Sequence, residues 1–147
     1  MVLVLMKKLL TLSFLPTSVD FGLLLLRLSV GATMLYVHGL NKLLQFQTLA
    51  PQFQSPIPQI PNQVAFGLMV FAEAICAALI FLGLMTRFAA LVLAINMGVA
   101  FFMVHQGYPI FSKVAPAAGS GELAFLYLSG FLMLFFAGAG RFSLDRR

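Results

Sequence analysis

Four long apolar runs occupy most of this chain and limit its fold more than any other feature. They cover roughly residues 20–43, 64–83, 88–104 and 122–137. A helix needs about 20 apolar residues to cross roughly 30 Å of hydrocarbon, so four such helices use nearly the whole chain. Apolar residues make up 61% of the sequence, whereas soluble domains contain about 45–50%. We therefore expect an all-α membrane protein, a four-transmembrane-helix antiparallel bundle.

The ends of the runs suggest how the chain is organised. We expect residues 1–19 to form a cytoplasmic or interfacial lead-in and residues 20–145 to form a single transmembrane domain. Thr17 or Ser18 is a candidate N-cap for the first helix, and Asp20 lies close to capping-box spacing. The segment 44–63 contains four prolines, which oppose helix, and its apolar residues predict packing over the helix ends.

Basic residues predict the orientation in the membrane. With four spans both termini share a side. One side then carries Lys7, Lys8, Arg87, Arg141, Arg146 and Arg147, and the other carries Lys42 and Lys113. The positive-inside rule places both termini in the cytoplasm, as expected for a multi-pass protein of the inner or plasma membrane. This distribution explains the net charge of +5 without nucleic acid as a partner.

The first apolar run carries a polar stripe. Its members are Arg27, Gly31, Met34, His38 and Lys42. Their spacings of three and four residues keep them on one helix face, which we expect to point into the bundle. Gly31 would allow close approach of a neighbouring helix. An alternative is that Arg27 and Lys42 extend to the two membrane surfaces.

Glu73 lies in the middle of the second run, too deep for its short side chain to reach water. An ionisable group at the bilayer centre costs from about 3 to above 10 kcal/mol, so it usually has a partner or faces a polar cavity. We expect Arg27 to be that partner in a bidentate pair. The alternative is that such a pair only fixes how two helices pack.

A second group of polar residues is expected near the outer helix ends. His38, Lys42, His105 and Glu122 fall at similar depth, and we expect them to form a proton-exchanging pocket under the proline-rich segment. The alternative is that each caps its own helix. The two histidines could ligate haem or a metal, but the sequence offers no third ligand near them and no Cys-x-x-Cys-His motif. Elsewhere, Asn96 suits an interhelical hydrogen bond and Cys76 suits simple packing.

An ordered set of short segments is similar to the DoxX family of small membrane proteins. The segments are Leu26-Arg-Leu-Ser-Val-Gly31, His38-Gly-Leu-Asn-Lys-Leu43, Ala72-Glu-Ala-Ile-Cys-Ala-Ala-Leu79, Gly83-Leu-Met-Thr-Arg-Phe-Ala-Ala90, Ala100, His105, Gly121-Glu-Leu-Ala124 and Gly138-Ala-Gly-Arg-Phe-Ser-Leu-Asp145. The resemblance covers about residues 20–145. Two departures are the proline-rich segment and Ala77-Ala78, where the family often has glycines.

The resemblance implies a four-helix bundle connected with quinone, sulfur or thiol redox systems. We expect a non-catalytic accessory subunit with a polar intramembrane cavity. The alternatives are a quinone-linked oxidoreductase subunit and a small-molecule transporter. The candidate cavity residues are Arg27, His38, Lys42, Glu73, His105 and Glu122. No catalytic residue or metal site is evident, and quinone is the one cofactor suggested. Expected partners are membrane lipids, a redox-enzyme subunit or a second copy of the chain.

Overall fold

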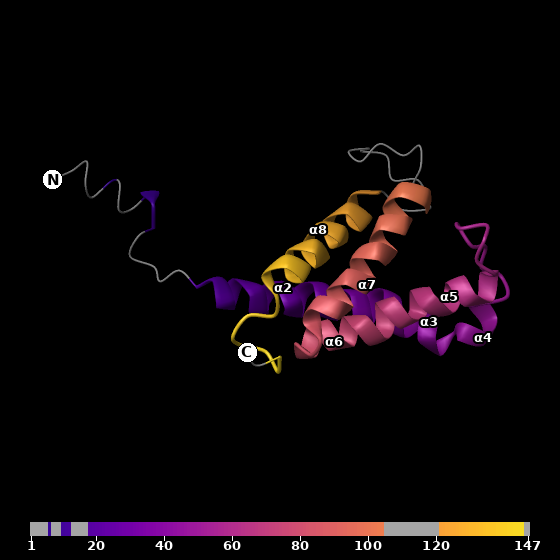
Figure 1. The fold of residues 1–147 in the computed structure, drawn as a ribbon, viewed down its shortest axis with the longest axis horizontal. Coiled ribbons are helices and arrows are strands. Elements are labelled where there is room, and N and C mark those ends of the chain that lie inside the picture. The colour runs from indigo at the N-terminus through magenta and orange to yellow at the C-terminus, as the bar shows by residue number, and fades with distance from the viewer. Residues whose placement is uncertain (1–5, 7–9, 13–17, 105–120, 146–147) are drawn as a thin grey trace.

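The computed structural model describes residues 6, 10–12, 18–104 and 121–145. Every regular element in these ranges is helical (Figure 1). Within the described part of the chain, three helices are long and apolar enough to cross a membrane: Val19–Leu44, Asn62–Leu82 and Thr86–Val104. The fourth apolar helix, Gly121–Ala137, has 17 residues, at the lower end of the roughly 17–25 needed for a span. These four helices confirm the expected all-α membrane class, with bounds close to the apolar runs.

The first span is a continuous helix that changes its winding part-way. It consists of α2 (Val19–Thr33), the π-helical segment η1 (Met34–Gly39) and α3 (Leu40–Leu44). The Ser18 side chain accepts a hydrogen bond from the backbone N–H of Phe21 at 3.2 Å, which confirms Ser18 as the N-cap. A π segment adds a residue to the turn and therefore rotates the faces that follow it.

The second span has the same design. After the short α4 (Phe46–Leu49), it comprises α5 (Asn62–Val70), the π-helical segment η2 (Phe71–Cys76) and α6 (Ala77–Leu82). Segments η1 and η2 pack against each other, and α2 packs against α6. The two spans therefore run side by side with their π segments at the same level (Figure 1).

The third and fourth spans form an antiparallel pair that leans across the first two (Figure 1). α7 (Thr86–Val99) continues into the π-helical η3 (Ala100–Val104), and α8 (Gly121–Ala137) lies alongside α7. The turn between α6 and α7 is tight because Gly83 adopts the left-handed conformation.

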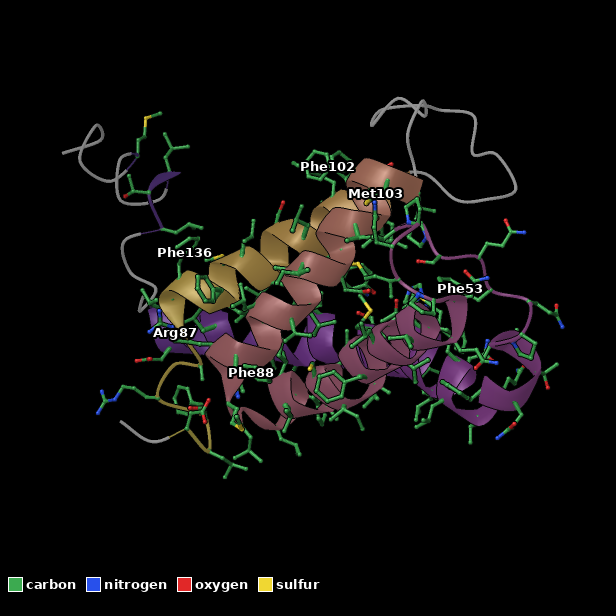
Figure 2. All side chains as sticks on the ribbon, turned by 45° about the vertical axis from the view of Figure 1, so that its right-hand side comes forward. Phe53, Arg87, Phe88, Phe102, Met103 and Phe136 are labelled. Carbon is green, nitrogen blue, oxygen red and sulfur yellow. The ribbon has the colours of Figure 1, made fainter. Side chains whose placement is uncertain are left out.

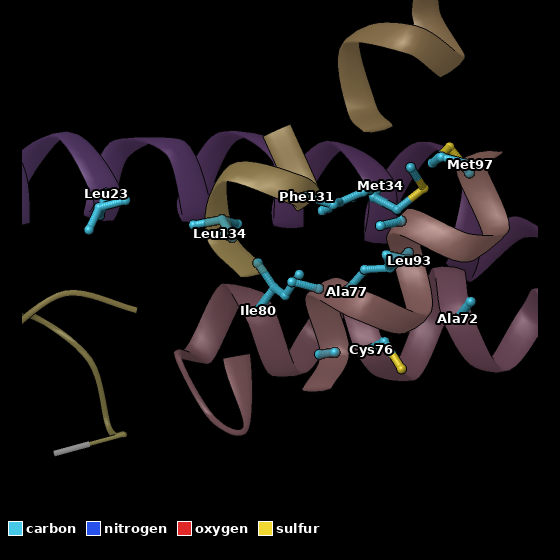
Figure 3. Packing of buried hydrophobic residues seen from close by; sticks show 13 residues of the cluster. Leu23, Met34, Ala72, Cys76, Ala77, Ile80, Leu93, Met97, Phe131 and Leu134 are labelled. Carbon is cyan, nitrogen blue, oxygen red and sulfur yellow. The ribbon is translucent and has the colours of Figure 1, made fainter. Parts of the chain in front are cut away.

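The core is built from small and branched side chains at the centre of the four spans (Figure 3). Cys76, Ile80, Leu93 and Phe131 are fully buried there. Burial of Cys76 agrees with its expected packing role. Gly31 also behaves as expected, because a Cβ at this position would lie 3.0 Å from the backbone nitrogen of Phe81.

The segment between α4 and α5 packs over the end of the bundle, as its apolar residues predicted. The rings of Phe46 and Phe53 each lie 5.3 Å from that of Phe66 on α5. Together with Val70 and Ala74 they belong to a second, smaller apolar cluster. The prolines exclude longer helix here, but one helical turn (α4) forms ahead of Pro51.

Candidate functional site

Arg27 lies at one end of the bundle and is 1% exposed. Its Nη2 donates to the backbone carbonyl of Phe142 at 2.6 Å, while Nε and Nη1 have no hydrogen-bond partner among the described residues. The expected pairing of Arg27 with Glu73 is therefore wrong. The guanidinium reaches toward the Gly83 turn and the C-terminal segment. The position of the C-terminal segment over Arg27 was not predicted from the sequence.

The C-terminal segment folds back over this end of the bundle and is tied down by carboxylates. Asp145 accepts hydrogen bonds from the backbone N–H groups of Met85 at 2.8 Å and Thr86 at 2.7 Å, so it caps the start of α7. Asp20 accepts from the backbone N–H of Arg141 at 2.9 Å, a tertiary role beyond the expected capping box. We call Arg27, Phe142 and Asp145 the Arg27 cluster.

The pKa of Asp145 is set by opposing influences. Partial burial raises the pKa, but the hydrogen bonds from Thr86 and Met85 and the nearby charge of Arg27 outweigh it, so the pKa is lowered overall. Asp145 is thus ionised in the folded protein and serves as a counter-charge to Arg27.

The partner of Glu73 is Lys42, which lies on the first span about fifteen residues after Arg27. Lys42 Nζ donates to Glu73 Oε2 at 2.5 Å. Asn96 Nδ2 of α7 donates to Glu73 Oε1 at 3.2 Å, which confirms Asn96 as an interhelical hydrogen-bonding residue. Three spans therefore converge on one carboxylate, whose side chain is 4% exposed.

His38 completes this group from η1. The His38 side chain is half-buried and interacts electrostatically with both Glu73 and Lys42. Its ring meets Tyr127 of α8 edge-on, with 6.0 Å between the ring centroids. The fourth span thus contacts this group through His38. We call Lys42, Glu73, Asn96 and His38 the Lys42 cluster.

The π segments position the Lys42 cluster. His38 lies in η1 and Glu73 lies in η2. Gly39 packs directly on the backbone of η2, because a Cβ at Gly39 would lie 2.7 Å from Ala74 Cα and would overlap the Glu73 carbonyl. Such π segments occur frequently at functional sites. Neither the π segments nor this close approach can be seen in the apolar pattern.

An open pocket of about 350 Å³ adjoins the Lys42 cluster. Its lining residues are Lys42, Leu49, Gln52, Phe53, Phe66 and Met69. Lys42 Nζ also lies 3.6 Å from Met69 Sδ, so the ammonium group is where the charged cluster meets the apolar pocket. Figure 2 shows Phe53 over the helices at this end of the bundle. Sequence reasoning did not single out Leu49, Gln52, Phe66 and Met69 as residues that line a pocket.

The remaining predicted residues are placed as follows. Glu122 is in the first turn of α8 and is exposed. His105 lies outside the described residues. The structure thus brings His38, Lys42 and Glu73 together and keeps Arg27 apart in its own cluster. A cavity role for any of these residues stays a prediction.

This arrangement suits binding and proton exchange with a lipophilic ligand. Lys42 places an ammonium donor at the edge of the apolar pocket, and the Glu73 carboxylate is hydrogen-bonded to that ammonium group. Because the Lys42 side chain is 25% exposed and lines the pocket, its ammonium group is accessible to a bound molecule. Fold and cluster together define a small helical membrane protein with a buried polar centre.

The chain belongs to the DoxX family, whose model matches residues 22–106. This range includes Arg27 and the whole Lys42 cluster, while the C-terminal segment that covers Arg27 lies beyond it. The earlier resemblance is thereby confirmed.

Two relatives are uncharacterized proteins of Haemophilus influenzae. One is 37% identical over 126 residues, covering 80% of this chain and 84% of the relative. The other is 30% identical over 102 residues, covering 68% of this chain and 64% of the relative. No solved structure matches the chain.

Proposed function

We propose that this protein is a membrane accessory subunit of a quinone-linked or thiol redox system and that it binds a quinone-like ligand beside Lys42. The observation that carries the proposal is the Lys42–Glu73 pair at the edge of an apolar pocket. A buried charged pair needs no pocket to stabilise a helix bundle. The Lys42 ammonium group pairs with Glu73 and also lines the pocket, so it can donate a hydrogen bond to a bound ligand.

The pocket agrees with a flat, lipophilic ligand that carries carbonyl oxygens. Its volume of about 350 Å³ lies within the range of roughly 300–1,000 Å³ typical of ligand sites. Phe53 and Phe66 provide aromatic walls, and Lys42 provides the hydrogen-bond donor for a carbonyl oxygen. Glu73 is hydrogen-bonded to Lys42, so Lys42 connects the ligand carbonyl oxygen to a group that can accept a proton.

We assign this protein a ligand-binding role. A complete redox reaction would require a partner protein. The side chains of the Lys42 cluster bind and exchange protons, whereas reduction of a quinone also needs an electron donor, which a redox-enzyme subunit would supply. Among the described residues, no three His, Cys, Asp or Glu side chains gather in a group that could hold a metal ion.

The described helices favour this proposal over transport. Transporter sites are typically formed by discontinuous helices with unwound backbone. Here the π segments η1 and η2 continue their helices without a break, from Val19 to Leu44 and from Asn62 to Leu82.

Native mass spectrometry of the protein, extracted gently with its lipids, tests the proposal. We expect a co-purifying mass that matches a quinone, or a redox subunit that remains attached. The Lys42→Gln variant should lose the quinone and retain any subunit held elsewhere. Recovery of the protein with lipids alone, and no binding of added decylubiquinone, would contradict the proposal.

A further inference from the structure

A second hollow lies at the opposite end of the bundle, between the start of α7 and the end of α8. It is an open groove of about 930 Å³. Its lining residues are Asp20, Met85, Thr86, Arg87, Phe88, Phe136, Ala137, Gly138, Ala139, Gly140, Arg141 and Asp145. None of these residues belongs to the Lys42 cluster, so the groove is separate from the proposed ligand pocket. We propose that it binds the headgroup of an anionic phospholipid.

The position of the groove suits a lipid headgroup. Thr86 begins a candidate membrane span and Ala137 ends the apolar α8, so the groove lies where two apolar helices leave the hydrocarbon. Figure 2 shows Phe136, Arg87 and Phe88 at this same end of the bundle. Phe136 is 77% exposed and Phe88 is 49% exposed, so apolar rings flank the groove on the side of the acyl chains.

Arg87 is held in place while its outer donors remain available. Its Nε donates to the backbone carbonyl of Phe135 at 3.0 Å, and its guanidinium carbon lies 5.5 Å from the centre of the Phe135 ring. These contacts fix the plane of the guanidinium and leave the Nη groups for a phosphate. A planar guanidinium held in this way matches two phosphate oxygens.

The groove carries an excess of positive charge, which favours binding of an anion. Both carboxylates are engaged by backbone amides: Asp20 by Arg141 and Asp145 by Met85 and Thr86. The charge of Asp145 is further offset by the buried Arg27. Among the described residues that line the groove, the two positive charges of Arg87 and Arg141 therefore exceed the single remaining negative charge of Asp20, and one phosphodiester supplies the missing negative charge. Basic pockets between transmembrane helices bind anionic headgroups in this way.

Titration of the full-length protein in neutral detergent tests the groove, with lipid adducts counted by native mass spectrometry. We expect tighter binding of dioleoyl phosphatidylglycerol than of dioleoyl phosphatidylcholine. Each exposed arginine near a surface contributes about fivefold to such binding, so Arg87→Gln with Arg141→Gln should weaken the phosphatidylglycerol complex about 25-fold. The control Lys113→Gln removes one charge from a segment expected on the opposite side and should leave binding unchanged.

Three results would overturn the proposal: equal binding of the two lipids, wild-type affinity in the double variant, or an equal loss in Lys113→Gln. Displacement of phosphatidylglycerol by inorganic phosphate would also overturn it, by assigning the groove to a free anion. If the double variant does not fold, Arg141→Gln carries the test, because that side chain is exposed and has only its backbone N–H bonded to Asp20.

Discussion

The first span carries one buried cation, Arg27, and one partly exposed cation, Lys42, and their surroundings differ in kind. Arg27 is 1% exposed, bonded to a backbone carbonyl and covered by the chain's own C-terminal segment. Lys42 is 25% exposed at its side chain, bonded to a carboxylate and open to a pocket. A cation closed in by main chain has little room for a ligand, so the Arg27 cluster serves the fold. The Lys42 cluster has one side open to a pocket, which is where we propose that a ligand binds.

The largest expected effect of a single substitution is at Arg27. The Arg27→Leu variant leaves the Phe142 carbonyl unpaired and removes the counter-charge of Asp145. Breaking a buried charged arrangement from one side costs about 3–5 kcal/mol. We expect a loss of this order in the free energy of unfolding, measured in mixed detergent by circular dichroism. A near-wild-type stability would mean that the C-terminal segment does not depend on Arg27.

The close approach of the first two spans gives the next largest effect. In Gly39→Ala the added methyl group meets the backbone of Glu73 and Ala74, which cannot move aside as a side chain can. Overpacking of this kind costs about 1–3 kcal/mol. The matched control is Gly67→Ala, since nothing lies within 4 Å of a Cβ at Gly67. Equal stability of the two variants would show that η1 and η2 are further apart than described.

A pair of double-mutant cycles sharpens the contrast between the two clusters. Lys42 and Glu73 are in direct contact, so Lys42→Met and Glu73→Leu should show a coupling energy of about 1 kcal/mol, with the double variant less damaged than the sum. Arg27→Leu and Glu73→Leu should add within about 0.5 kcal/mol, because they share no partner. Coupling in the second cycle alone would restore the pairing first expected from the sequence.

The smallest effect concerns pH and the cap of α7. The pKa of Asp145 is lowered in the folded protein, so its contribution to stability is present above its unfolded value of about 3.9 and is lost as the pH falls through the folded pKa. Removal of such a cap in Asp145→Ala should cost about 1 kcal/mol at neutral pH and flatten the acid side of the stability profile. Parallel acid profiles for the two proteins would contradict this.

The sequence predicted the four spans because hydrocarbon thickness fixes their length and excludes most polar residues. The bounds of the first helix, expected near residues 20 and 43, are Val19 and Leu44. The inward stripe was also confirmed for Arg27, Gly31 and Met34, all of which are buried.

The apolar pattern and the residue spacing did not predict which polar side chains pair with each other. Arg27 was matched to Glu73 by charge alone, while its actual neighbour, the Phe142 carbonyl, is a backbone group 115 residues away. Carbonyl acceptors leave no mark in a sequence. The π segments and the close packing of Gly39 on η2 are also invisible in the sequence pattern. Lys42 was on the predicted stripe, but nothing in the spacing singled it out as the partner of Glu73.

Decylubiquinone binding by Lys42→Gln tests most directly whether the two clusters have different roles. We expect more than tenfold weaker binding, as is typical when a charged hydrogen bond of about 1.5–3 kcal/mol is lost. His38→Ala and Phe53→Ala should weaken binding as well. The control Phe102→Ala, which removes an equally large ring that is 65% exposed and outside the pocket, should bind as wild type. Unchanged affinity in Lys42→Gln, in a protein that remains folded, would contradict a ligand site at the Lys42 cluster.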